Sequence, residues 1–468
     1  MAEVKKRPIS VLIVTEYFFP TIGGVERHVY KLAEYLIKFG LKVVIFTRNF
    51  GNRRVGIRYL SNGIKVYHHW NVMFLPPSTT PTFFDAFPYY RSVLIRENVD
   101  IIHMHMASSR YKGEFELCAN LLDYRLIFTD HSLFSMCDIG PVFLNEYTRM
   151  FSIFDDHMVA VSNKHRENMV LRSYIDPRKI SVVPNALESD DFKCNEEPLL
   201  KDKIVIVYIS RLCERKGIDL LTQVVPIVCK KHDNVDFIIG GGGPKLSMLR
   251  GMVDKHYLHD RVKILGYIPT HEVNKVLRQG HIFLNTSQTE SFCIALLEAA
   301  SSGLILVSTD VGGIPEVLPH DIILLSEYDP VAISNKIDEA ISMLQTADTS
   351  SYHQRVKQMY SWESVAKKTL MLYYDVLNKP RMTFREKLYK LLRKKKIGGT
   401  NIHTLILFRV LSFYSFDHFI HFLGHIRVPF PKVFPYTIKY KNLTMTLGVI
   451  LSWHQIGLRR IEKIKKTR

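Results

Sequence analysis

Residues Ile9–Phe46 read ISVLIVTEYFFPTIGGVERHVYKLAEYLIKFGLKVVIF, and this stretch decides the fold. It opens with the apolar run Ile9–Val14, which is typical of a strand covered on both faces. A stripe of apolar residues at helical spacing follows the glycine turn: Val25, Val29, Leu32, Leu36 and Phe39. Gly40 ends that helix, and Leu41–Phe46 is a second apolar strand. A strand, a helix and a strand in this order predict a βαβ unit with parallel strands.

The same alternation of strands and helices continues along most of the chain. Further strands of the first half are expected at Ile64–His68, Ile101–His105, Leu126–Thr129, His157–Val161 and Ile180–Val183. A polar segment that contains Pro198, residues 190–202, interrupts the series and is interpreted as a linker. A second series begins at Ile204–Ile209 and continues to a helix at Asp329–Leu344. Helices are also expected at Leu220–Lys230, His271–Gln279 and Ser361–Leu377. Two series with one break predict an α/β protein with two facing, doubly wound, Rossmann-like domains.

The chain is expected to have five segments. They are an N-terminal domain at 1–189, the linker at 190–202, a second domain at 203–350, a crossover helix region at 351–378 and a tail at 379–468. The tail mixes basic clusters with apolar and aromatic runs, but none reaches the roughly 17–25 apolar residues of a spanning helix. This composition predicts a membrane-associated or partner-associated tail, held by anionic lipid headgroups. The alternative is a solvated basic coil.

Composition narrows the classes of partner. The chain has 468 residues, 47% of them hydrophobic, and a formal net charge of +18. Such a basic excess indicates nucleic acid, an anionic membrane surface or phosphorylated ligands. The sequence has no RNA-binding signature, zinc-finger spacing or arginine-rich repeat, so nucleic acid is not an expected partner. Six scattered cysteines without a Cys-x-x-Cys pair, and an N-terminus without signal-peptide features, favour catalytic domains in the cytosol.

Two glutamates enclose a largely apolar run, Glu290-Ser-Phe-Cys-Ile-Ala-Leu-Leu-Glu298. A carboxylate in apolar surroundings is costly to desolvate unless it holds a partner. The expected partner is polyhydroxylated, a sugar or a ribose. The two carboxylates could instead be the acid and nucleophile of a glycosidase, which needs a facing pair at a defined gap. Basic and glycine-rich loops elsewhere in the chain favour a nucleotide-sugar donor.

A basic loop follows the first strand of the second series. Ser210–Gly217 contains Arg211 and Lys216, which leave the carboxyl end of that strand, where open α/β sheets bind ligands. Two fixed cations there could neutralise a diphosphate leaving group in place of a metal. The alternative is a solvated surface loop.

Glycine turns follow two other strands. Gly23 and Gly24 stand between a strand and a helix, where backbone amides can bind a phosphate, although such a pair is more often only a turn. Gly240–Gly243 also follows a strand, and a flat ligand could lie against the backbone of Gly242 and Gly243.

Histidines at strand ends are further candidates. His131 follows the strand Leu126–Thr129, where it could hold or shuttle a proton near a sugar hydroxyl. With 20 histidines in the chain, a lone one is usually structural. His103 and His105 share one face of a strand, but no third metal ligand is visible in the sequence, so no metal site is expected.

Together these motifs resemble the retaining glycosyltransferases of family 4, which have the GT-B fold. The segments that carry the resemblance are Glu16–Glu26, Phe128–Leu133, Val183–Ala186, Ser210–Leu220, Thr289–Ala300 and Val311–Pro319, within about residues 9–375. Two of these segments contain the sequences Phe-Thr-Asp-His-Ser-Leu and Gly-Gly-Ile-Pro-Glu-Val-Leu-Pro. Both sequences are similar to segments of one group within this family, the catalytic subunits of phosphatidylinositol N-acetylglucosaminyltransferases. These enzymes begin glycosylphosphatidylinositol (GPI) anchor synthesis.

The resemblance implies UDP-N-acetylglucosamine as donor, phosphatidylinositol as acceptor and retention of the anomeric configuration. It implies no bound metal and no other cofactor. It also implies a place at the endoplasmic reticulum membrane, with the catalytic domains on the cytosolic face, together with other subunits of a membrane transferase complex. This tail departs from the family's usual C-terminal membrane span because charges and prolines interrupt it.

Roles can be carried over residue by residue. Arg211 and Lys216 would hold the diphosphate, and Glu298 would hold the ribose. Glu290 would contact the hydroxyls of the donor sugar, and His131 would face the sugar near the reacting centre. The glycine pair after the first strand would approach the phosphate from the first domain.

Two alternative functions stay open. One is another family 4 transferase with a lipid acceptor, for example one that moves mannose onto an inositol lipid. The other is a non-catalytic scaffold that only binds a nucleotide sugar. A scaffold could lose its polar site residues freely. This chain has all five of them, Glu290, Glu298, Arg211, Lys216 and His131, which argues against a scaffold.

Overall fold

The computed structural model describes residues 7–21, 23–50, 55–69, 87–109, 111–133, 139–195, 203–383 and 386–387. These residues all belong to one compact unit, Met1–Leu407. Most of the expected tail therefore lies outside the described residues. Among the described residues, no helix combines the length and apolar character needed to cross a bilayer.

The first half forms an eight-stranded sheet in the order β3-β4-β2-β1-β5-β6-β7-β8. Its strands are β1 Ser10–Val14, β2 Lys42–Arg48, β3 Gly56–Tyr59, β4 Lys65–His69, β5 Ile101–His105, β6 Arg125–Thr129, β7 His157–Ala160 and β8 Ile180–Val182. All neighbours pair in parallel except β3, which runs antiparallel to β4 at the edge. Every residue of β1 is buried, as the continuous apolar run predicts.

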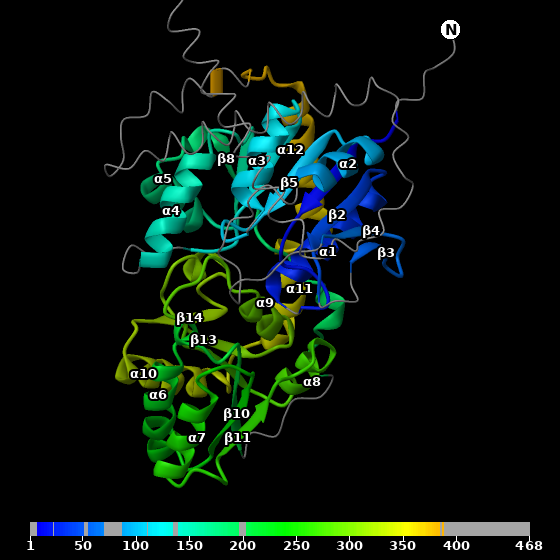
Figure 1. The fold of residues 1–468 in the computed structure, drawn as a ribbon. Helices are drawn as coiled ribbons and strands as arrows, with labels where there is room; N and C mark the ends of the chain where they lie inside the picture. The colour runs from blue at the N-terminus through cyan, green and yellow to red at the C-terminus, as the bar shows by residue number, and fades with distance from the viewer. Residues whose placement is uncertain are drawn as a thin grey trace, which may run out of the picture. The chain divides into compact units, whose positions relative to one another are not determined.

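Helices connect these strands and cover the sheet (Figure 1). They are α1 Gly24–Lys38, α2 Phe87–Glu97, α3 Lys112–Leu121, α4 Ile139–Phe151 and α5 Asn163–Ser173. Val29, Leu32 and Leu36 of α1 are buried against one face, as their spacing predicts. Side chains alternate between the two faces of the sheet along β2, and Phe46 contacts Tyr90 of α2 and Phe115 of α3.

The second half forms a six-stranded parallel sheet in the order β11-β10-β9-β12-β13-β14. Its strands are β9 Ile204–Ile209, β10 Val235–Gly240, β11 Val262–Gly266, β12 Ile282–Asn285, β13 Ile305–Thr309 and β14 Ile323–Ser326. The helices are α6 Ile218–Lys231, α7 Leu246–Lys255, α8 Val273–Leu277, α9 Ile294–Ser301, α10 Pro330–Met343 and α11 Tyr352–Met359.

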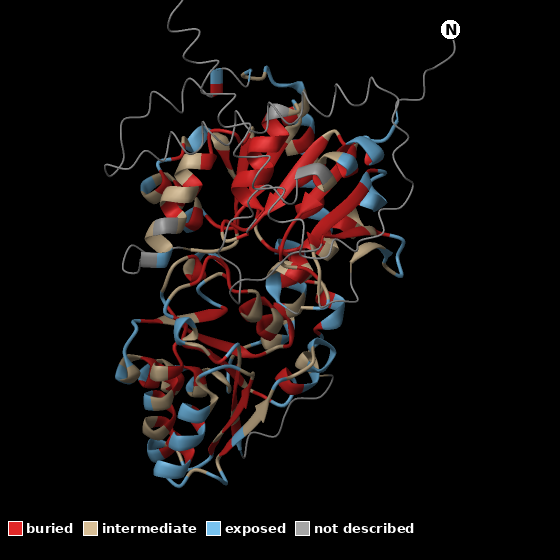
Figure 2. Ribbon diagram, in the orientation of Figure 1, coloured by how far each residue is buried: buried red, intermediate tan, exposed pale blue. Residues whose placement is uncertain are grey.

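Two separate cores flank the second sheet. Alternate residues of β9 enter different cores, Ile206 with α6, α7 and α10, and Val207 with α8, α9 and α11. Buried strands lie between helices whose outer surfaces include exposed residues (Figure 2). Helices on both faces of a parallel sheet are the doubly wound arrangement that the sequence predicts.

The last long helix returns to the first sheet. Helix α12, Trp362–Asn378, packs against α1 and adds Trp362, Val365 and Tyr373 to the core beside β1. The chain continues along the first half beyond α12, because Arg381 pairs with Asp123 at 2.5 Å and buried Lys387 donates to the carbonyl oxygen of Phe154 at 3.1 Å. The first residues of the expected tail therefore contact the protein itself.

Several elements differ from the sequence predictions. The helix expected at His271–Gln279 is a short 3-10 turn, Thr270–Glu272, followed by the five-residue α8. Strands β3 and β14 were not expected. β3 is only four residues long and partly exposed, and β14 carries only two fully buried residues, so neither gives a strong apolar pattern.

Candidate active site

A lysine and a glutamate meet at the carboxyl edge of the second sheet. Lys216 lies in the short turn Glu214–Lys216 that follows β9, and Glu290 lies in the loop that follows β12. Nζ of Lys216 donates to Oε1 of Glu290. β9 and β12 are neighbours between which the strand order reverses, since β10 lies on the other side of β9. This reversal is where open α/β sheets bind ligands.

Neighbouring groups fix the backbone around Lys216. The residue after it, Gly217, has a φ of +66°, and a Cβ there would stand 1.7 Å from the carbonyl oxygen of Thr286. Only glycine allows this approach. The hydroxyl of Tyr208 donates to the carbonyl oxygen of Lys216 at 2.8 Å, and that of Thr286 donates to the same oxygen at 3.2 Å. The lysine is therefore held beside the end of β12.

Glu290 is fixed from two sides. The hydroxyl of Ser287 donates to its Oε1 at 3.2 Å. Gly312, with a φ of +56°, approaches its main chain so closely that a Cβ would lie 2.1 Å from the carbonyl oxygen of Glu290. The amide of Gly313 donates to the same carbonyl at 2.8 Å. The Val-Gly-Gly-Ile-Pro segment thus braces the loop that carries the carboxylate.

The lysine–glutamate pair is largely removed from solvent, with side-chain exposures of 18% and 9%. Burial alone would lower the pKa of Lys216, but the Glu290 carboxylate, together with Cys293 and Tyr208, outweighs burial and the pKa is raised. The ammonium group is therefore charged at neutral pH. A buried, fixed cation is suited to bind an anionic group such as a phosphate.

Glu298, the second glutamate, has a different partner. It lies on α9, and its Oε1 accepts from Arg27 of α1 at 3.2 Å. Arg27 also pairs with Asp191 at 3.1 Å. Burial raises the pKa of Glu298 to about 7, against the opposing effect of Arg27. Gly24 of the glycine pair faces the same helix, because a Cβ there would lie 3.5 Å from Ile294.

The basic loop Ser210–Gly217 and the glycine turn Gly240–Gly243 lie against each other. The amide of Leu212, next to Arg211, donates to the carbonyl oxygen of Gly242 at 2.9 Å. Gly243 approaches the same loop, and a Cβ there would stand 2.3 Å from the carbonyl oxygen of Leu212. The side chain of Arg211 is exposed and makes no hydrogen bond or ion pair with the described residues. The structure therefore joins these glycines to the basic loop but does not place Arg211 against Lys216.

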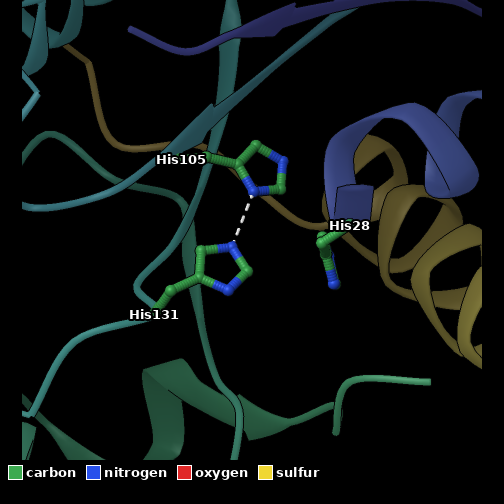
Figure 3. Close-up of side chains that lie close together, drawn as sticks. All are labelled: His28, His105 and His131. Carbon is green, nitrogen blue, oxygen red and sulfur yellow. Dashed lines mark hydrogen bonds between the residues drawn. The ribbon is translucent and has the colours of Figure 1, made fainter. Parts of the chain in front are cut away.

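His131 lies next to the Glu290 loop. The hydroxyl of Ser291 donates to the main-chain oxygen of His131 at 2.5 Å, which joins the loop after β6 to the loop after β12. The imidazole Nε2 of His131 is 3.0 Å from Nδ1 of His105 (Figure 3). Its ring also packs edge-on against His28 of α1, at 4.7 Å between centroids. Burial lowers the pKa of His131 well below its ordinary value, so the ring is neutral.

The expectation of no metal site stays a prediction, and the structure brings together three histidines that the sequence did not group. His28, His105 and His131 each offer a ring nitrogen, and the three nitrogens lie within 4.8 Å of one another. His103 takes no part, because its two nitrogens contact the hydroxyls of Tyr373 and Thr129, both at 2.7 Å.

The candidate site also includes Arg27, His28 and Ser291, which no motif in the sequence had indicated. His28 carried a signal, since it falls three residues after Val25 and four before Leu32, on the buried stripe of its helix. Arg27 and Ser291 carried none, because each acts on a residue more than 150 positions away in the chain.

Comparison with known families agrees with this geometry. A family model described as "Glycosyl transferases group 1" matches residues 190–357, which contain both glutamates and the basic loop. A second model, "PIGA (GPI anchor biosynthesis)", matches residues 49–138, which contain His105 and His131.

Two relatives and one solved structure match most of the chain. The chain is 44% identical over 393 residues to a protein of Arabidopsis thaliana that is named as a phosphatidylinositol N-acetylglucosaminyltransferase subunit, covering 84% of this chain and 87% of the relative. The human protein of the same name is 42% identical over 79% of this chain and 76% of its own. The structure of Anabaena Alr3699/HepE in complex with UDP has a TM-score of 0.64 at 15% identity, covers 79% of this chain and 100% of that one, and shows the shared GT-B fold. The chain is a glycosyltransferase, and it belongs to the PIGA family of phosphatidylinositol N-acetylglucosaminyltransferase subunits.

Proposed function

We propose that this chain transfers N-acetylglucosamine from UDP-N-acetylglucosamine to phosphatidylinositol with retention of configuration, the first step of GPI-anchor synthesis. The names of the relatives support the reaction. The observation that carries the proposal for this chain is the buried pair of Lys216 and Glu290 between β9 and β12.

The residues divide the donor between them. Lys216 binds the diphosphate and stabilises the negative charge that develops on it as the glycosidic bond breaks. Glu290, held beside the lysine by Ser287, accepts hydrogen bonds from hydroxyls of the sugar. Glu298 accepts from the ribose. A carboxylate suits a diol because each of its oxygens can accept from a neighbouring hydroxyl.

Two other parts complete the donor site. Arg211 is exposed beside the glycine turn that contains Gly242 and Gly243, so it can move toward a bound diphosphate. The N-terminus of α1 begins at Gly24, directly after Gly23, and offers backbone amides to the phosphate. With cations and amides to neutralise the leaving group, the proposed mechanism needs no metal ion or other cofactor.

The setting of the enzyme is part of the proposal. The relatives are named as subunits, which supports assembly with further subunits. The acceptor is a membrane lipid, and the chain has a net charge of +18, which favours an anionic membrane surface. We place the chain at the endoplasmic reticulum membrane with its catalytic domains on the cytosolic face.

The donor and acceptor can be tested together. Membranes from cells that lack only their own catalytic subunit, and express this chain, would receive radiolabelled UDP-N-acetylglucosamine or GDP-mannose. We expect label from the first donor alone, in a lipid that phosphatidylinositol-specific phospholipase C cleaves. A lipid labelled from GDP-mannose, or one that resists the phospholipase, would refute the proposed donor or acceptor.

A further inference from the structure

A cluster of three histidines, His28, His105 and His131, lies at the carboxyl edge of the first sheet. His105 is the last residue of β5, His131 follows β6, and His28 lies on α1, which follows β1. β1 and β5 are the neighbours between which the order of this sheet reverses. The cluster therefore occupies the same topological position in the first sheet as Lys216 and Glu290 do in the second.

The hydrogen bond between His105 and His131 limits which ring nitrogen of His131 can carry its proton. Nδ1 of His105 and Nε2 of His131 are 3.0 Å apart, and the rings are stacked at an angle of 16° (Figure 3). Burial lowers the pKa of both rings well below the ordinary value, so each ring is neutral and has a single N–H. One proton therefore lies between the two nitrogens, and it can be covalently bound to either ring.

The surroundings of His105 decide between the two arrangements. Its side chain is fully buried, and its other nitrogen, Nε2, has no hydrogen-bond partner among the described residues. If His131 donated, His105 would carry its proton on Nε2 and bury an N–H group without an acceptor, which is rare in proteins. If His105 donates from Nδ1, the buried Nε2 is only an unused acceptor. The proton of His131 then resides on its own Nδ1.

The packing leaves His131 little freedom to turn. His28 packs edge-on against it, and Trp362 of α12 packs edge-on against His28 at 5.3 Å between centroids. The main chain of His131 is fixed at both polar atoms, since its amide donates to Asp130 at 2.9 Å and its carbonyl accepts from Ser291.

From this arrangement we propose that His105 is a positioning residue. Its Nδ1–H donates to Nε2 of His131 and keeps the proton of His131 on Nδ1, so that His131 offers an N–H donor rather than a base to the bound donor sugar. The inference rests on the proposed function for the identity of that sugar and for its contact with His131. His131 then binds an oxygen of the sugar and holds it in place, while removal of the acceptor's proton falls to another group.

Kinetics of two substitutions separate positioning from packing. His105→Asn keeps an N–H donor close to the place of Nδ1, whereas His105→Leu fills the space without one. We expect His105→Leu to lower kcat by up to about 100-fold, the effect of a misplaced reacting geometry, with KM for the donor nearly unchanged. His105→Asn should recover most of the loss. Exposed His259 provides the matched control, and His259→Asn should leave kcat unchanged. Equal losses in both His105 variants, or none in either, would overturn the proposal.

Nitrogen NMR of the full chain reads the tautomer without any substrate. With ring-labelled histidine, the signals that disappear in His131→Asn belong to His131. We expect a protonated Nδ1 and a bare Nε2 in the wild type, and a mixture of tautomers in His105→Leu. A protonated Nε2 in the wild type would overturn the proposal.

The same spectra separate two other outcomes. If the wild type shows the expected tautomer but transfers no sugar, the proposed function fails and the positioning contact stands. If the His131 signals change when a chelator is added and return with Zn²⁺, the cluster is a metal site and the proposal fails.

Discussion

At the scale of the residue, the site depends on charges that are compensated in the absence of a ligand. Lys216 pairs with Glu290, and Arg27 pairs with Glu298. Each pair joins segments that are far apart in the sequence, β9 with β12 and α1 with α9. A ligand that enters must satisfy these groups at least as well as they satisfy each other. A diphosphate can do so for Lys216, because it replaces one anionic partner by another.

Replacing Lys216 tests this charge balance. Lys216→Met keeps the length of the side chain but leaves Glu290 buried without its cation. Affinity for UDP should fall by at least about 30-fold, since losing one member of a buried charge pair costs about 2 kcal/mol or more. Calorimetric titration of the purified full chain measures it. Lys336→Met, at an exposed lysine that pairs with Glu339 on α10, is the control and should bind UDP like the wild type. Equal affinity in the two variants would remove the role given to Lys216.

The buried histidines predict how stability depends on pH. Burial lowers the pKa of His103 to about 3, whereas an unfolded histidine titrates near 6.5. Between these values the unfolded chain binds more protons, so the stability that the neutral ring contributes is complete above pH about 6.5 and is lost as the pH falls. His103→Gln removes this titration.

Urea unfolding at pH 7 and pH 5 measures the difference. We expect the wild type to lose about 2 kcal/mol more than His103→Gln over this interval. Equal losses would show that His103 is not held neutral in the folded protein.

The sequence predicted the polar residues at strand ends but not their partners. A histidine or glutamate after a buried strand could be recognised from the pattern alone. That His131 would contact His105, or that Glu298 would meet Arg27, depends on which strands are neighbours and how two sheets meet. Such contacts follow from tertiary packing, and they leave no periodic signal in the sequence.

At the scale of the element, glycines decide where the loops of the second sheet can go. Gly312→Ala would put a methyl group 2.1 Å from the carbonyl oxygen of Glu290, at a φ of +56°. We expect a loss of about 2 kcal/mol or more in stability, together with reduced transfer, because the Glu290 loop must move. Gly251→Ala, within α7 and with open space around it, should be neutral or slightly stabilising. Unfolding and transfer measured side by side for both variants check this, and unchanged transfer in Gly312→Ala would contradict the bracing role.

The βαβ pattern made the long elements predictable. β1, α1, β2, β9, α6 and α12 all lie within a few residues of their expected ranges, because each has a continuous apolar run or a regular stripe. The short edge strand β3 and the helix α8 differ from expectation because each buries few residues, so neighbouring elements rather than local sequence fix their form.

At the scale of the whole molecule, two sheets of the same design contribute opposite kinds of group. The reversal in the first sheet carries neutral histidines, and the reversal in the second carries a buried ion pair. Direct contacts join them, Ser291 to His131 and Arg27 to Glu298, so residues of both halves meet at the candidate site. In the proposed function, one set of groups serves the donor's diphosphate and the other serves the reacting sugar.

The most direct test of this account compares two glutamine variants in the transfer reaction. Membranes that lack only their own catalytic subunit would express the wild type, Glu290→Gln or the exposed control Glu339→Gln, at matched protein levels. The rate at which labelled N-acetylglucosamine enters phosphatidylinositol would be measured. The account predicts equal rates for the wild type and Glu339→Gln, and a loss of about 100-fold or more in Glu290→Gln, as when a group that stabilises the transition state is removed. Transfer by Glu290→Gln at the wild-type rate, or no transfer by the wild type, would contradict it.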